Sequence, residues 1–146
     1  MSNLASDQPI GWEAIWNSGR VPKRFASFSA PNSTVVEWAD SLPPGALIVD
    51  IGCGVGRHCI YLGGRGFRMA GMDVSPSGVT QSQAACATRG IPFDGRVSDM
   101  STLPWPDSTF DAALSTSTIH HQLRANLVRS MVEVARVLKP GGLFLV

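Results

Sequence analysis

The chain has 146 residues, of which 44% are hydrophobic and 16% charged, and its formal net charge is +1. These values suit a single folded domain and exclude a disordered chain, while the near-neutral charge gives no support for a nucleic-acid partner. No apolar stretch approaches the length of a membrane span, and the N-terminus lacks the basic start and apolar segment of a secretory signal.

Two short helices are predicted within residues 1–44, which we interpret as an N-terminal helical cap. The first contains Trp12 and Trp16, which recur at helical spacing. The second spans about residues 32–42 and ends at Pro43-Pro44-Gly45. A polar tail and a cationic loop are predicted at residues 1–9 and 19–24.

From residue 46 onward apolar runs alternate with helical patterns, which predicts a doubly wound α/β fold around a parallel sheet. The apolar run at 46–51 is typical of a central strand covered on both faces. Pro92 and Gly95 weaken the third strand and suit it to a sheet edge. The predicted strands are 46–51, 68–73, 93–97, 110–116 and 143–146, and the predicted helices between them are 56–62, 75–89 and 123–138.

A glycine turn follows the first predicted strand. Residues 49–56 read Val-Asp-Ile-Gly-Cys-Gly-Val-Gly, and Asp73 closes the next apolar run. Glycines adopt backbone angles closed to other residues and let a ligand approach the bare backbone. A carboxylate about 20 residues further on can accept hydrogen bonds from ribose hydroxyls. This pairing predicts a nucleoside-binding site.

The glycine spacing separates two cofactor classes. A dinucleotide fingerprint has its third glycine where this chain has Arg57. The sequence instead reads Asp50-x-Gly52-x-Gly54-x-Gly56, which resembles motif I of the class I S-adenosylmethionine-dependent methyltransferases. A carboxylate at Asp50 disfavours a pyrophosphate and tolerates the positively charged sulfonium and amino groups of S-adenosylmethionine. We therefore favour S-adenosylmethionine over a nicotinamide cofactor.

The resemblance continues in order over residues 45–146, and several ordered motifs are more specific than one glycine loop. It implies a Rossmann-like sheet of order 3-2-1-4-5 with helices on both faces, and methyl transfer to a small-molecule acceptor. The segments that carry it are Gly71-Met72-Asp73-Val74-Ser75, Ser98-Asp99-Met100, Leu103-Pro104-Trp105-Pro106-Asp107, Phe110-Asp111, Thr118-Ile119-His120-His121 and residues 134–142.

The resemblance also implies which residues bind the cofactor. Asp73 would accept the ribose hydroxyls and Asp99 the adenine amine, while Val74 would pack on the adenine ring. From the residues alone, Asp73 could instead cap the following helix, Asp99 could belong to a plain turn, and Asp50 could be a strand-end acid. The full expected set is Asp50, Gly52, Cys53, Gly54, Gly56, Asp73, Val74, Asp99, Met100 and Thr116.

His120 and His121 are the candidate catalytic residues, because they follow the fourth predicted strand and an imidazole can deprotonate an acceptor. The alternative is that one lines the pocket while the other hydrogen-bonds its loop. Arg57 could meet an anionic group of the cofactor or acceptor, whereas we expect His58 to be solvated. Trp105 is interpreted as a lid over the adenine edge or as a packing residue.

Three cysteines form an odd number with no Cys-x-x-Cys pair, which is typical of buried thiols in the reducing cytoplasm. Histidines and cysteines nowhere gather in a ligand pattern, so we expect no metal.

The chain ends within the last predicted strand, whereas the resembled family continues with one more helix and two more strands. We therefore expect an incomplete methyltransferase domain over residues 45–146, of undetermined acceptor and oligomeric state. The alternatives are a binding-only inactive domain, a tRNA methyltransferase and a nicotinamide-dependent oxidoreductase.

Overall fold

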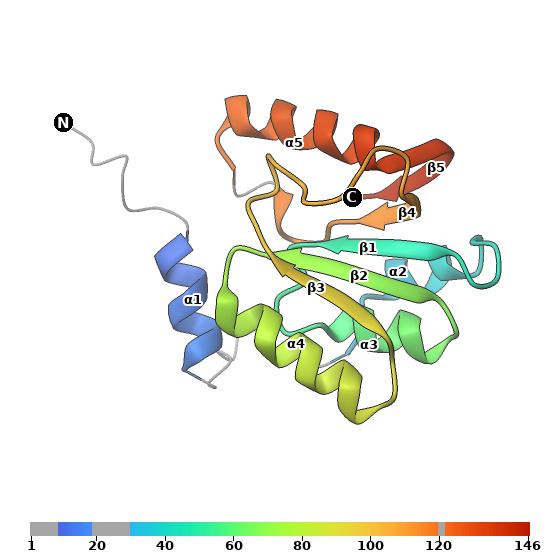
Figure 1. Cartoon of the computed structure of the whole chain (residues 1–146), viewed down its shortest axis with the longest axis horizontal. Helices are drawn as coiled ribbons and strands as arrows, with labels where there is room; N and C mark the ends of the chain where they lie inside the picture. Colours follow the sequence, from blue (N-terminus) through green and yellow to red (C-terminus); the bar gives the residue numbers. More distant parts are fainter. Residues whose placement is uncertain (1–8, 19–29, 120–121) are drawn as a thin grey trace.

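The computed structural model describes residues 9–18, 30–119 and 122–146 and contains a five-stranded parallel sheet of order β3-β2-β1-β4-β5. Helices lie on both faces of this sheet (Figure 1). The predicted doubly wound α/β fold and its strand order are confirmed. The elements are α1 (Pro9–Asn17), α2 (Ser33–Ala39), β1 (Leu47–Ile51), α3 (Arg57–Gly64), β2 (Arg68–Asp73), α4 (Pro76–Thr88), β3 (Phe93–Val97), β4 (Phe110–Leu114), α5 (Arg124–Val137) and β5 (Leu138–Leu145).

Each sheet face carries its own hydrophobic core, because side chains of a strand alternate between faces. In β1, Ile48 packs in the core beneath α2, α3 and α4, whereas Val49 and Ile51 pack in the core beneath α5. All three are fully buried. Apart from the buried Asp50, the central strand is therefore apolar and covered on both faces, as the sequence pattern predicted.

The observed bounds of the strands and helices agree with the predicted bounds in some elements and differ in others. Strands β2 and β3 have the predicted bounds, and β3 lies at the predicted sheet edge. Strand β5 begins at Leu138 rather than at residue 143, because Leu138 already pairs with Phe110 before a register shift. Helix α3 continues through Gly63, where a Cβ would lie 2.4 Å from the Ile91 side chain. The glycine thus permits close packing there, and does not end the helix.

The two N-terminal helices pack on the same side of the sheet. Asn32 caps α2 by accepting a hydrogen bond from the Thr34 N–H, and Val35 and Ala39 enter the core that contains Ile48. Helix α1 packs against α4 (Figure 1). Most of the predicted tail and the cationic loop lie outside the described residues. None of the described helices is long and apolar enough to cross a membrane.

Candidate functional site

The glycine turn lies at the carboxyl end of β1, next to the end of β2. Gly52, Gly54 and Gly56 all have positive φ, at 79°, 52° and 88°. A Cβ on Gly52 would lie 2.2 Å from the Thr118 side chain, and one on Gly56 would lie 2.7 Å from the Ser82 Cβ. These positions need glycine for both backbone conformation and space.

Asp73 is the last residue of β2 and is almost completely buried. Its Oδ2 accepts a hydrogen bond from the Gly54 N–H at 2.9 Å, and its Oδ1 accepts one from the Ser75 N–H at 2.9 Å. Burial raises the pKa of Asp73, and these backbone hydrogen bonds oppose that rise. The carboxylate therefore holds the turn before α4 and joins that turn to the glycine loop. Ser75 is the N-cap of α4, so Asp73 does not cap this helix.

Asp50 is a buried carboxyl in β1, one residue before the strand ends. Its exposed fraction is 2%, and its Oδ2 lies 3.7 Å from the Cys59 Sγ and 4.0 Å from the His58 Nδ1. Burial raises the pKa of Asp50 to about 7, and the nearby charge of Asp73 adds to this rise. A positively charged ligand group would stabilise its ionised form.

His58 is buried, with an exposed fraction of 2%, so the expectation of a solvated side chain is wrong. Its Nε2 accepts a hydrogen bond from the Asn32 N–H at 3.1 Å, and its Nδ1 lies 3.4 Å from the half-buried Thr116 Oγ1. Burial lowers the pKa of His58 to about 4, with a further contribution from Arg57. The cause of the error is long-range: the chain entering α2 covers the first turn of α3, which no local pattern reveals.

We expect opposite stability effects from Asp50 and His58 as the pH changes. The raised pKa of Asp50 makes it stabilising below about pH 4, and this contribution disappears as the pH rises to about 7. The lowered pKa of His58 makes it stabilising above about pH 6.5, and this contribution disappears as the pH falls to about 4. Between these limits the two contributions largely cancel in the wild type.

A variant that lacks one of the two residues should therefore show the pH dependence that the other residue gives to the free energy of unfolding. Urea unfolding from pH 4 to 8 measures this dependence. In Asp50→Asn the free energy of unfolding should rise with pH by up to about 3 kcal/mol between about pH 4 and 6.5. In His58→Gln, which keeps an acceptor for the Asn32 N–H, it should fall by up to about 4 kcal/mol between about pH 4 and 7. Parallel profiles in the two variants would contradict the assigned environments.

The loop after β3 contains two of the expected cofactor residues. Asp99 is exposed, and its Oδ1 accepts hydrogen bonds from the Ser101 N–H at 2.8 Å and the Ser101 hydroxyl at 2.5 Å. This is the geometry of the plain turn that was one interpretation of Asp99. Met100 is buried in the core beneath α5. The loop is attached to β2, because the Ser98 N–H donates to the Asp73 carbonyl oxygen at 3.0 Å.

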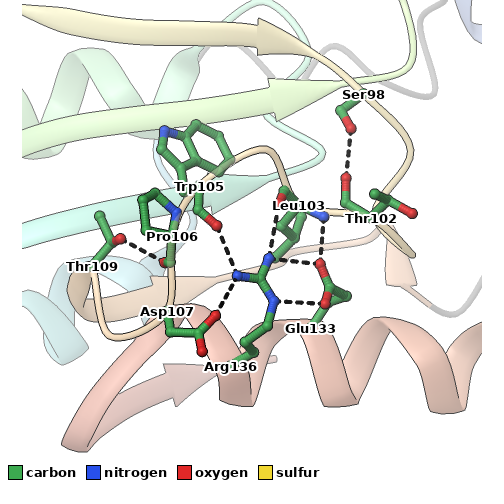
Figure 2. Close-up of polar contacts among 9 residues, drawn as sticks. All are labelled: Ser98, Thr102, Leu103, Trp105, Pro106, Asp107, Thr109, Glu133 and Arg136. Atoms are coloured by element: carbon green, nitrogen blue, oxygen red, sulfur yellow. Dashed lines mark hydrogen bonds and ion pairs between the residues drawn. The ribbon is translucent and has the colours of Figure 1, made fainter.

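Arg136 of α5 holds the far end of this loop, in a contact that sequence reasoning missed (Figure 2). Its guanidinium donates to the Leu103 and Trp105 carbonyl oxygens, at 2.9 and 2.8 Å, and forms ion pairs with Glu133 and Asp107. Glu133 in turn accepts a hydrogen bond from the Leu103 N–H at 2.7 Å. The i,i+3 spacing of Glu133 and Arg136 was the available signal.

Trp105 is a packing residue. Its ring packs edge-on against Phe110 at 5.3 Å, and its Nε1 donates to the Asp94 Oδ2 at 2.8 Å. The Arg96 guanidinium lies 5.0 Å from the centre of the Trp105 ring. The indole is therefore enclosed by side chains of β3 and β4, which assigns it to the fold.

The three cysteines are free and buried, and Cys53 lies inside the glycine turn. Within the described ranges, no group of three or more histidine, cysteine or acidic residues could hold a metal ion.

Val74 and Thr116 are half-buried at the carboxyl ends of β2 and β4. The expected cofactor residues from these strands therefore lie at the same end of the sheet as the glycine turn. His120 and His121, the candidate catalytic residues, lie outside the described residues.

Residues 49–146 match the methyltransferase domain family. The chain belongs to this family. A fatty-acid O-methyltransferase of Mycolicibacterium smegmatis is 36% identical over 104 residues, which are 69% of this chain and 36% of that protein. A mouse tRNA (carboxymethyluridine(34)-5-O)-methyltransferase is 36% identical over 115 residues, which are 77% of this chain and 16% of that protein. The chain thus spans about a third or less of the length of these relatives.

A solved methyltransferase has the same fold. The 1,6-didemethyltoxoflavin-N1-methyltransferase of Burkholderia thailandensis, whose structure contains S-adenosylhomocysteine, superposes with a TM-score of 0.78 at 23% identity. The superposition covers 94% of this chain and 59% of that one. The methyltransferase domain and its Rossmann-like sheet agree with the resemblance found in the sequence.

Proposed function

We propose that this chain binds S-adenosylmethionine and transfers its methyl group to a small-molecule acceptor. The observation that carries the proposal is the pair of buried carboxyl groups, Asp50 and Asp73, at neighbouring strand ends beside the glycine turn. When both are ionised, these buried carboxylates repel each other and a pyrophosphate, but they attract a positively charged group, which in turn favours the ionised form of Asp50. S-adenosylmethionine has two such groups, the sulfonium and the amine.

In this proposal the chain contributes binding and orientation, because the cofactor itself supplies the reactive methyl group. The backbone at Gly52 and Gly54 would contact the methionine part, with Asp50 near its amine. Asp73 would accept the ribose hydroxyls while keeping its bonds to Gly54 and Ser75. Asp99 and the Met100 N–H would meet the adenine, and Cys53, Gly56, Val74 and Thr116 would complete the cofactor site. His120 and His121 remain the proposed acceptor-side bases.

The acceptor class rests on charge and on the relatives. The formal net charge of +1 offers no broad attraction for a polynucleotide, which supports a small molecule. The similarity to a tRNA methyltransferase supports a second candidate, methyl transfer to tRNA. Three free, buried cysteines fit a cytoplasmic protein.

Calorimetric titration with S-adenosylhomocysteine, with NADH in a parallel titration, tests the cofactor assignment. We expect S-adenosylhomocysteine to bind and NADH not to bind. Incubation with labelled S-adenosylmethionine and a panel of carboxylic acids, phenols, amines and unmodified tRNA then tests the acceptor. Labelled small-molecule product supports the main proposal, and labelled tRNA supports the second candidate. Cofactor binding without any product favours the binding-only domain, and NADH binding would overturn the assignment.

A further inference from the structure

Helix α1 contacts both residues whose backbone amides hold Asp73. On one side, the Glu13 carboxylate accepts hydrogen bonds from the hydroxyls of Ser75 and Ser77 and from the Ser77 N–H, the last at 3.1 Å. On the other side, one turn further along α1, the Trp16 ring lies against Gly54, where a Cβ would be 3.0 Å from the ring. The same helix therefore reaches both flanks of one carboxylate.

Glu13 acts on the start of α4. Ser75 is the N-cap of this helix, and its hydroxyl accepts a hydrogen bond from the Gly78 N–H at 3.0 Å while donating its own proton to Glu13. A carboxylate at a helix N-terminus is favoured by the unpaired N–H groups and by the helix dipole. These hydrogen bonds, from Ser75 first and then Ser77, lower the pKa of Glu13. Glu13 is consequently ionised at neutral pH and fixes the position of Ser75.

Ser75 connects Glu13 to Asp73. Its backbone N–H donates to the Asp73 Oδ1, and the Asp73 Oδ2 accepts from the Gly54 N–H. Gly54 lies beneath the Trp16 ring, and Gln81 of α4 donates to the Trp16 carbonyl oxygen at 2.7 Å. Helix α1 is therefore linked to Asp73 by two routes, one through Ser75 and the other through Gly54.

We propose that Glu13 is a positioning residue for the adenosyl site, which sets the Asp73 carboxylate through Ser75 before the ligand binds. This inference rests on the proposed function for its ligand, and it gives α1 a role beyond that of a cap over one face of the sheet. Preorganisation of this kind increases affinity, because the cost of ordering the site is met during folding.

The test is a double-mutant cycle for S-adenosylhomocysteine affinity, using Glu13→Ala, Asp73→Asn and the double variant. We expect Glu13→Ala alone to weaken binding about tenfold, since the two residues share one hydrogen-bond network. In the Asp73→Asn background the same change should weaken binding by no more than about twofold. Glu37→Ala, a matched change at an exposed residue of α2, should leave the affinity unchanged.

Equal losses in both backgrounds would overturn the inference, because Glu13 would then act independently of Asp73. A second readout does not depend on the ligand. Amide hydrogen exchange at Gly54 and Ser75 should become several-fold faster in Glu13→Ala and stay unchanged in Glu37→Ala. If the wild type fails to bind S-adenosylhomocysteine, the proposed function fails. The exchange result still decides whether Glu13 positions Asp73, and unchanged exchange would show that it does not.

Discussion

Replacing Asp73 with alanine is expected to weaken S-adenosylhomocysteine binding about 100-fold, because the two charge-assisted hydrogen bonds that we propose it accepts from the ribose would disappear. The same change leaves the N–H groups of Gly54 and Ser75 without their acceptor. Each buried and unpaired amide costs about 1–3 kcal/mol, so the free energy of unfolding should fall by about 2–6 kcal/mol. Calorimetry and urea unfolding measure the two effects separately.

Two further variants distinguish a lost ligand contact from a damaged fold. Asp73→Asn keeps one acceptor oxygen and should lose less stability than the alanine variant, while still binding the ligand poorly. Asp40→Ala removes an exposed carboxylate that pairs with Arg65 and should change neither affinity nor stability appreciably. A folded Asp73→Ala protein with wild-type affinity would show that the ribose does not lie at Asp73.

The features that local sequence could predict are those encoded by short patterns. The apolar run of β1, the glycines at 52, 54 and 56 and the acid at the end of β2 are each visible within a few residues, and the structure places them together. Parallel strands bring their carboxyl ends to one edge, so topology alone collects these groups.

The features that sequence missed depend on contacts between distant segments. The burial of His58 requires the chain before α2 to cover α3, a contact with residue Asn32, 26 positions away. Glu13 reaches Ser75 across 62 positions, and Arg136 reaches Leu103 across 33. A polar side chain that is covered by a remote segment has the same local sequence as one on an open helix face. For this reason His58 was expected to be solvated, and no contact was predicted for Glu13 or Arg136.

Replacing Arg136 with alanine should have the largest effect on the loop that carries Asp99 and Met100. The change leaves two carbonyl oxygens without a donor and deprives Glu133 of its cation (Figure 2). The Arg136 side chain is 30% exposed, so water compensates part of the loss. We expect the free energy of unfolding to fall by about 2–3 kcal/mol.

The matched control is Arg65→Ala, which removes an exposed arginine paired with Asp40 and should cost less than about 1 kcal/mol. Arg136→Lys keeps the charge but not the planar fork that spans two carbonyl oxygens and two carboxylates, so its loss should be intermediate. Because the Arg136 contacts hold the loop at residues 103–107, faster amide exchange should appear there before global unfolding in Arg136→Ala. Equal destabilisation by the Arg65 and Arg136 variants would mean that Arg136 acts only as a surface charge. The loop would then be held by the burial of Leu103 and Trp105 and by their hydrogen bonds to Glu133 and Asp94.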